Sequence, residues 1–189
     1  MTSSPTAVPP PPGGELPDAP DAGLPDTPDA GLPDAPDVPE ALGVPDAELL
    51  RLDHQVCFSL HAASRAFGGV YRDALKDLGL TYPQYLVMLV LWEHGPQPVK
   101  AIGERLRLDS GTLSPLLKRL ETAGLVRRER SAADERSVTV QLTGEGDGLR
   151  ERALPVPRRI LASTGMTVEE ILTLQGLLGR LTGSLDRAQ

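Results

Sequence analysis

Apolar residues recur with helical spacing over most of the chain after residue 45. From Pro45-Asp46 to about Leu78 the pattern predicts one long helix, with Asp46 able to cap its first amides and Gly79 ending it. The segment from Pro83 to His94 is apolar on nearly all sides, which is typical of a buried helix. We therefore expect this second helix, with Trp92, to form the centre of the core.

Two shorter amphipathic segments follow. The first is a short helix that closes at the Leu108-Asp109 turn, and its apolar face consists of Val99, Ile102 and Leu106. The second carries the most regular stripe in the chain, made of Leu113, Leu116, Leu117 and Leu120, and Gly124 supplies a left-handed stop. Pro115 lies inside this helix and removes one backbone hydrogen bond, so we expect a bend or a late start.

The period then changes from helical to alternating. RRERS and SVTVQL flank the polar AADER, and Val138, Val140 and Leu142 share one face, which predicts a β-hairpin with a basic, flexible tip. From Thr143 onwards we expect two helices, broken around Pro155, Pro157 and Thr164-Gly165. The last apolar stripe consists of Ile171, Leu174, Leu178 and Leu181. Helices of this kind at a chain end often serve dimerisation.

The N-terminal part has a different composition. Between Glu15 and Glu40 a Pro/Asp/Ala octapeptide repeats as LPDAPDAG, LPDTPDAG and LPDAPDVP, with almost nothing large to bury. We expect residues 1–45 to form a disordered acidic tail and residues 46–189 to form a single folded domain.

The tail also explains the acidic net charge of −7. Residues 1–48 hold ten Asp or Glu and no Lys or Arg, which leaves 16 acidic against all 19 basic residues and a net charge of +3 for the rest. The predicted domain is therefore mildly basic, and the local clustering of its arginines matters more than the total charge.

No segment is apolar enough to span a membrane, and the N-terminus lacks the pattern of a signal peptide, so we expect a cytoplasmic protein without a membrane partner. The single cysteine, Cys57, excludes an internal disulfide. With only three scattered histidines we expect no structural metal, and we expect no cofactor.

Two short helices followed by a basic hairpin compose a winged helix-turn-helix, in which the second helix enters the major groove of DNA. The expected fold is thus mainly α with a small β-hairpin, and helices at both ends of the domain serve dimerisation. The expected DNA-contacting residues are Ser110, Thr112, Ser114, Lys118, Arg119, Arg127, Arg128, Asp134 and Arg136.

A leucine stripe with outward Lys and Arg is, by itself, more often an ordinary solvated helix. The hairpin changes this interpretation, because four arginines cluster around one loop and repel each other unless anions are near. They are Arg127, Arg128, Arg130 and Arg136, and Asp134 and Glu135 neutralise only part of their charge.

Three segments together resemble the MarR family of bacterial regulators, and more closely its organic hydroperoxide resistance regulators of the one-cysteine type. The segments are LDHQVCFSLHAASRAF, LTYPQYLVMLVLWEH and IGERLRLDSGTLSPLLKRLETAGLVRRERSAADERSVTVQLT. The resemblance covers about residues 49–185 and leaves out the N-terminal repeat.

The resemblance implies that Cys57 is a peroxide sensor and that Tyr71 and Tyr82 are tyrosines that hydrogen-bond it. His61 stands where the family has a third tyrosine, one turn after the cysteine. Cys57 and Tyr71 are fourteen residues apart on one predicted helix, or about 21 Å along its axis. A contact between them therefore requires Tyr71 to come from a second copy of the chain.

Taken without the resemblance, Cys57 is more often an inert small hydrophobe, and the two tyrosines are ordinary packing residues. A protonated His61 would favour the thiolate and Asp53 would oppose it. Because the predicted helix begins at Asp46, we expect Cys57 to lie several turns inside it, where the helix dipole helps little.

The expected function is a repressor that binds operator DNA as a reduced homodimer and dissociates when organic hydroperoxides oxidise Cys57, after which a low-molecular-weight thiol captures the sulfur. The expected protein is not an enzyme. Three alternatives stay open: a MarR-type repressor that responds to a phenolic ligand with Cys57 structural, a thiol peroxidase, and a winged helix that binds proteins.

Overall fold

The computed structural model describes residues 46–130 and 138–188. Its N-terminal part consists of α1 (Asp46–Leu49), the 3-10 turn η2 (Leu52–His54), α2 (Val56–Leu75), the 3-10 turn η3 (Lys76–Leu78) and α3 (Tyr82–His94). Then follow β1 (Gln97–Pro98), α4 (Val99–Leu106), α5 (Ser110–Thr122), β2 (Val126–Arg130), β3 (Val138–Leu142), α6 (Gly144–Ala153), α7 (Pro155–Thr164) and α8 (Val168–Arg187). The fold is mainly helical with one small antiparallel sheet, as expected.

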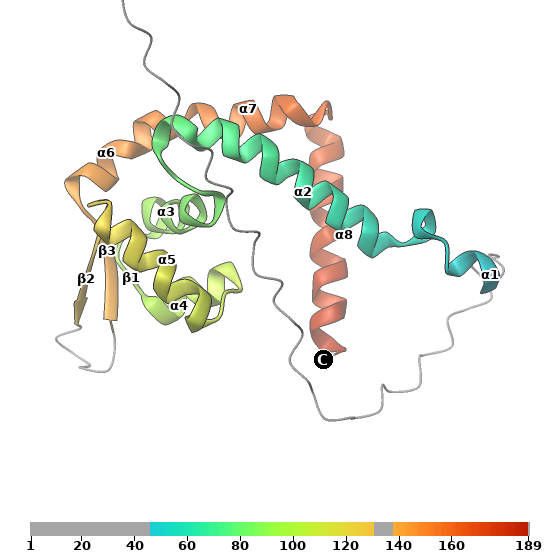
Figure 1. Ribbon diagram of the computed structural model, residues 1–189, viewed down its shortest axis with the longest axis horizontal. Helices are drawn as coiled ribbons and strands as arrows, with labels where there is room; N and C mark the ends of the chain where they lie inside the picture. The colour runs from blue at the N-terminus through green and yellow to red at the C-terminus, as the bar shows by residue number, and fades with distance from the viewer. Residues whose placement is uncertain (1–45, 131–137, 189) are drawn as a thin grey trace, which may run out of the picture. The chain divides into compact units, whose positions relative to one another are not determined.

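The central helix is α3, as the apolar sequence predicts. Figure 1 shows it nearly end-on, with α2 and α7 on one side and α4 and α5 on the other. Its buried residues are Tyr85, Val87, Met88, Val90 and Leu91. The helix begins at a capping box, in which the Thr81 amide donates to Gln84 Oε1 at 2.8 Å.

The predicted single helix from Asp46 to Leu78 is wrong, because the chain is extended at Gln55, which has φ −83° and ψ 109°. A 3-10 turn over Leu52–His54 precedes this break, and the Gln55 side chain donates to the Leu49 carbonyl. Helix α2 therefore begins afresh at Val56 and places Cys57 in its first turn. The side chain of Asp46, expected as a cap, lies outside the described residues.

Helices α4 and α5 form the predicted pair with a tight turn. Arg107 closes α4 in the left-handed conformation, with φ 54° and ψ 41°. Gly103 lets the turn approach, since a Cβ on it would lie 2.9 Å from the Leu108 carbonyl oxygen. Helix α5 begins at Ser110, five residues before Pro115, so the expectation of a late start is wrong. The Asp109 cap stabilises the first turn of α5, which precedes Pro115 in the chain.

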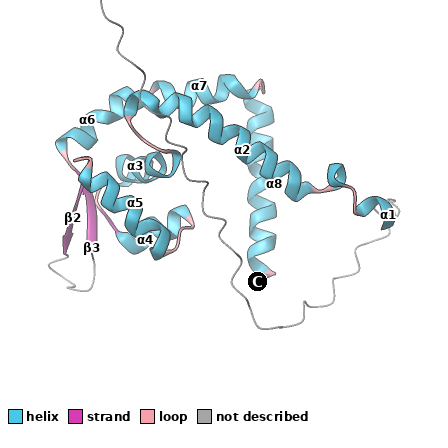
Figure 2. Ribbon diagram, in the orientation of Figure 1, coloured by secondary structure: helices cyan, strands magenta, loops and turns pink. Residues whose placement is uncertain are grey.

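The hairpin pairs β2 with β3 in antiparallel register, with Arg128 opposite Val140. A third strand was not predicted: the two residues of β1 pair with the other edge of β3. Pro98 is tolerated there because β1 is an edge strand. Figure 2 shows the sheet beside α5 and α6. Residues 131–137, where the tip was expected, lie outside the described residues.

The C-terminal part contains three helices instead of the expected two. The expected break at Pro155 is confirmed, because α6 ends at Ala153 and Pro155 begins α7, where its missing amide costs nothing. Gly165, with φ 66°, ends α7, and a capping box between Thr167 and Glu170 begins α8. In α8 no residue is buried. None of the helices in the described part of the chain is long and apolar enough to cross a membrane.

Candidate functional site

The first turn of α5 is fixed by its cap. Asp109 accepts hydrogen bonds from the Thr112 amide and from the Thr112 hydroxyl, both at 2.8 Å. The bond from the Thr112 backbone, followed by that from its side chain, lowers the pKa of Asp109. The cap thus orders the end of α5 that a winged helix directs at DNA, and it engages the hydroxyl of Thr112, one of the expected contact residues.

Helix α5 divides its residues as the sequence predicts. The leucine stripe is buried, with Leu113, Leu117 and Leu120 at most 1% exposed. The expected DNA-contacting residues of the helix are all exposed: Ser110, Thr112, Ser114, Lys118 and Arg119. The structure therefore brings these five polar side chains together on one helix that is anchored to α3 through its opposite face.

The first strand of the wing is held against the end of α5. Arg128 donates from Nε and Nη2 to Glu121 Oε2 at 2.8 and 2.6 Å, and the Arg128 amide donates to Glu121 Oε1 at 3.1 Å. The side-chain bonds from Arg128 lower the pKa of Glu121. Arg128 was expected to contact DNA, but its guanidinium is engaged by Glu121, which sequence reasoning did not select.

The remaining wing residues are only partly in view. Arg127 is exposed and its Nε lies 3.1 Å from Glu129 Oε1. Asp134 and Arg136, expected at the wing tip, lie outside the described residues. Among the residues that the structure describes, β2 carries Arg127, Arg128 and Arg130, and this strand contacts α5.

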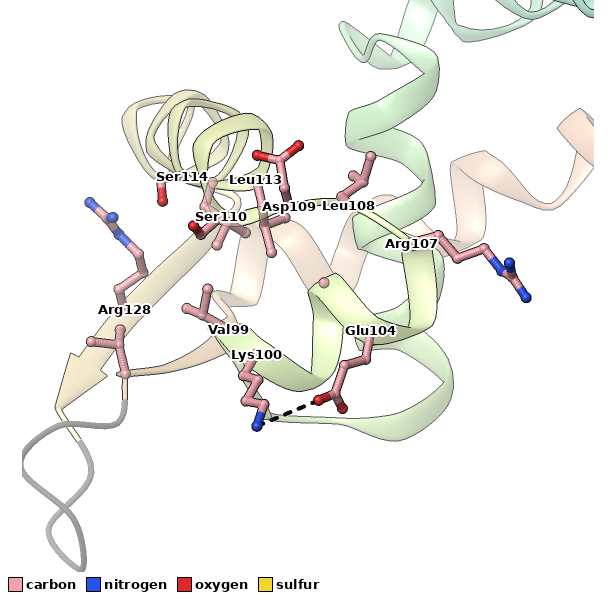
Figure 3. A pocket seen from close by; sticks show the side chains of 13 residues that line it. Val99, Lys100, Glu104, Arg107, Leu108, Asp109, Ser110, Leu113, Ser114 and Arg128 are labelled. Atoms are coloured by element: carbon pink, nitrogen blue, oxygen red, sulfur yellow. Dashed lines mark ion pairs between the residues drawn. The ribbon is translucent and has the colours of Figure 1, made fainter. Parts of the chain in front are cut away.

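A groove of about 870 Å³ separates α4 and α5 from the wing. Figure 3 shows Ser110 and Ser114 of α5 and Arg128 of β2 around it, with Lys100 paired to Glu104 at 3.8 Å on the α4 side. Arg107 also lines the groove, and its guanidinium, which points away from Arg128 in the same view, lies 2.9 Å from Asp186 at the end of α8.

The candidate sensor lies at the start of a different helix. Cys57 is the second residue of α2 and is exposed. The expectation that it lies several turns inside a helix is wrong, because the break at Gln55 restarts the helix. The free amides of a first helical turn favour negative charge nearby, which is a common setting for a reactive thiol. His61 follows one turn later and is also exposed.

Tyr71 and Tyr82 meet at the other end of α2. Their ring centroids are 4.4 Å apart, and the ring of Tyr85 lies 6.2 Å from Tyr71. Burial, followed by the neighbouring Tyr82, raises the pKa of Tyr71. Within one chain the structure thus brings the tyrosines together but not to Cys57, which lies fourteen residues, or about 21 Å, away along α2. Tyr85 was missed, although its spacing of three from Tyr82 puts both on one side of α3.

Large apolar side chains are exposed along α2 and α8. On α2, Phe58 is 42% exposed and Phe67 is 40% exposed. On α8 the exposed residues include Leu172, Leu174, Leu177 and Leu185. Exposed apolar patches are typical of protein interfaces. These are the two helical regions in which the sequence predicts dimerisation.

A helix pair with an anchored second helix and a basic hairpin beside it defines the class: the protein is a winged-helix transcriptional regulator. The family model described as transcriptional regulator SarA/Rot matches residues 70–152. The chain is 55% identical over 119 residues to the HTH-type transcriptional regulator TtmR of Methylorubrum extorquens strain PA1, which covers 63% of this chain and 61% of TtmR.

The chain is also 46% identical over 136 residues to the organic hydroperoxide resistance transcriptional regulator of Bacillus subtilis strain 168. The matched region covers 72% of this chain and 92% of that protein. Among solved structures, reduced AbfR bound to DNA matches with a TM-score of 0.64 and 39% identity, over 74% of this chain and 96% of AbfR; AbfR is a protein of Staphylococcus epidermidis. The chain therefore belongs to the organic hydroperoxide resistance regulators of the MarR family.

Proposed function

We propose that this regulator is a cytoplasmic repressor that binds operator DNA as a homodimer while Cys57 is reduced and releases it when organic hydroperoxides oxidise Cys57. The observation that carries the proposal is the position of the single thiol, exposed in the first turn of α2, on a helix that also exposes Phe58 and Phe67. The Bacillus subtilis relative is named for organic hydroperoxide resistance, which supports the choice of oxidant.

The proposed sensor is shared between two chains. If two α2 helices cross antiparallel, Cys57 of one protomer meets Tyr71 and Tyr82 of its partner, which the 21 Å separation forbids within one chain. The exposed Phe58 and Phe67 then line an apolar entrance for the organic part of the hydroperoxide. His61, one turn from Cys57, replaces a family tyrosine beside the sulfur.

The chemical step needs no cofactor. The Cys57 thiolate attacks the terminal oxygen of the hydroperoxide, an S–O bond forms, and the O–O bond breaks. Sulfur loses two electrons and becomes a sulfenic acid, and the departing alkoxide takes a proton from water to become an alcohol. A low-molecular-weight thiol then condenses with the sulfenic acid, which gives a mixed disulfide and water.

On DNA, the exposed residues of α5 enter the major groove: Ser110, Thr112, Ser114, Lys118 and Arg119. Arg127 contacts phosphates. Arg128 also contacts a phosphate when its guanidinium is not bound to Glu121. At the wing tip, outside the described residues, we propose that Arg136 enters the minor groove and that Asp134 braces it. Oxidation at the shared sensor changes the angle between the two wings, so both can no longer engage one operator.

An electrophoretic mobility shift assay with and without cumene hydroperoxide tests the proposal. The wild type should release its operator, and Cys57→Ser should stay bound. Equal release of both proteins would contradict the redox role. Release by a phenolic compound that Cys57→Ser leaves unchanged would favour a ligand-responsive repressor. Consumption of many equivalents of hydroperoxide per chain would favour a peroxidase.

A charge variant tests the DNA interface. Arg119→Ala should weaken operator binding and reduce the slope of affinity against salt concentration by about one. Arg150→Ala on α6, which removes an exposed arginine outside the proposed interface, is the matched control and should change neither quantity. Equal effects of the two variants would contradict the assigned interface and favour a winged helix that binds another partner.

Residues 1–45 lie outside the described residues, and we propose that they form an acidic tail separate from the domain at 46–189. With no basic residue, this segment acts as a polyanion that either keeps the protein in solution or competes with DNA for the basic face. Removing residues 1–44 should raise operator affinity at low salt, and the gain should disappear at high salt. Identical affinity at every salt concentration would remove the competing role.

A further inference from the structure

Tyr85 and Trp92 connect the tyrosine cluster to the base of the wing. Tyr85 is 2% exposed, and its ring lies 6.2 Å from that of Tyr71. Trp92 follows seven residues, or about two turns, later on the same side of α3. Its ring meets Tyr85 edge-on, with the centroids 6.2 Å apart. One aromatic row therefore runs from Tyr82 through Tyr71 of α2 to Tyr85, and then along α3 to Trp92.

The last residue of this row, Trp92, makes a hydrogen bond to α6. Trp92 Nε1 donates a hydrogen bond of 3.0 Å to the carbonyl oxygen of Gly146, in the first turn of α6. Trp92 is half-buried, so this bond is partly shielded from water and holds the indole in one orientation. A change in the position of the Trp92 ring therefore acts directly on Gly146.

Gly146 is closely packed against the backbone at Leu125, so it cannot stay in place when the Trp92 ring moves. A Cβ on it would lie 1.9 Å from the carbonyl oxygen of Leu125, the residue immediately before β2. The Gly146 amide donates to Thr143 Oγ1 at 3.1 Å, and Thr143 immediately follows β3. The Thr143 hydroxyl donates to the Gly124 carbonyl at 2.6 Å. One glycine therefore touches the base of both wing strands.

A small tilt at the base of a strand becomes a larger displacement at its far end. The five residues of β2 span about 17 Å, so a tilt of about 5° at its base moves its far end by about 1.5 Å. Protein interiors have few voids that could dissipate the shift between Tyr85 and Leu125. The wing is thus mechanically tied to the tyrosine cluster without a path through α5.

We propose that Tyr85, Trp92 and Gly146 are positioning residues that transmit the oxidation state of the shared sensor to the base of the wing. The inference rests on the proposed function, because Tyr71 and Tyr82 must sense Cys57 for the row to carry a signal. Trp92 and Gly146 do not touch the sulfur or the DNA in this account, and they act through Leu125 and Thr143.

The first experiment uses the intrinsic fluorescence of Trp92, the only tryptophan in the chain. When the DNA-bound wild type is treated with cumene hydroperoxide, the Trp92 emission should change at the same rate as DNA is released. Cys57→Ser should show neither change. Release of DNA from the wild type with unchanged Trp92 emission would overturn the inference while leaving the proposed function intact.

The second experiment removes only the hydrogen bond. Trp92→Phe keeps an aromatic ring against Tyr85 but cannot donate to Gly146, so its reduced form should bind the operator within about threefold of the wild type. Mass spectrometry should show sulfenic acid forming at Cys57 at the wild-type rate. The rise in Kd on oxidation should nevertheless fall at least fivefold below that of the wild type.

Gly148→Ala is the matched control on α6, because a Cβ there meets nothing within 4 Å, and its response to oxidation should equal that of the wild type. A full oxidative release by Trp92→Phe would overturn the inference. Oxidation of Cys57 without release in the wild type itself would contradict the proposed function, and the inference would fall with it.

Discussion

Arg128 on the first wing strand and Glu121 in the last turn of α5 form a clasp of three hydrogen bonds, with the shortest, from Nη2, at 2.6 Å. The clasp uses both the side chain and the amide of Arg128. It therefore links the wing to the end of α5 and restrains how far the two elements move relative to each other.

The clasp predicts a pH-dependent contribution to stability. Because Arg128 lowers the pKa of Glu121 in the folded state, the contribution is complete above the unfolded pKa of about 4.3 and is lost as pH falls through the folded value. Urea unfolding should show Glu121→Gln less stable than the wild type at pH 7, by at most about 1 kcal/mol because both side chains are about one-third exposed. The difference should shrink as pH drops below 4.

Glu151→Gln serves as the control for this experiment, since it removes an exposed carboxylate from α6 without touching the clasp. A difference between Glu121→Gln and the wild type that is the same at pH 7 and at low pH would show that the Glu121 charge contributes nothing.

Gly146 and Gly148 form a natural pair for testing the packing at the wing base. Gly146→Ala should destabilise the protein by about 1–3 kcal/mol or more, because the new Cβ meets the Leu125 carbonyl oxygen. Gly148→Ala places its Cβ in open space on the same helix, so it should be neutral or stabilising by up to about 1 kcal/mol. Thermal unfolding of both variants measures this, and equal melting temperatures would refute the close contact.

Much of the fold is encoded in local patterns. The leucine stripe of α5, the apolar α3 and the alternation of β3 each follow from side-chain period alone, because one face of each element must be buried. The same patterns predicted the class of DNA interface, since winged-helix proteins place the exposed residues of the second helix beside the hairpin.

Other features depend on contacts that no period records. No Gly or Pro lies at the break at Gln55, so the sequence carries no signal for the start of α2. Cys57 was therefore predicted too deep inside a helix. The clasp of Glu121 on Arg128 and the bond from Trp92 to Gly146 join residues 7 and 54 positions apart. The first contact forms only when the hairpin packs against α5, and the second forms only when α6 packs against α3.

The exposed leucines of α8 predict an oligomer that one charge disrupts. Leu177 is 49% exposed in the single chain, and Leu177→Glu should shift the protein from dimer to monomer and reduce operator affinity at least tenfold. Gln175→Glu, two residues earlier and also exposed, is the matched control and should remain a dimer. Sedimentation velocity measures the outcome. A dimer that survives Leu177→Glu would place the interface elsewhere.

The central claim is that Cys57 of one protomer lies against Tyr71 of its partner, and disulfide trapping tests it directly. Tyr71→Cys adds a second thiol that is about 21 Å from Cys57 along α2 of its own chain, so the two cannot pair within one protomer. Mild oxidation of this variant should give a covalently linked dimer on a non-reducing gel, and the additional change Cys57→Ser should abolish it. A variant that stays monomeric on the gel while sedimenting as a dimer would contradict the shared sensor.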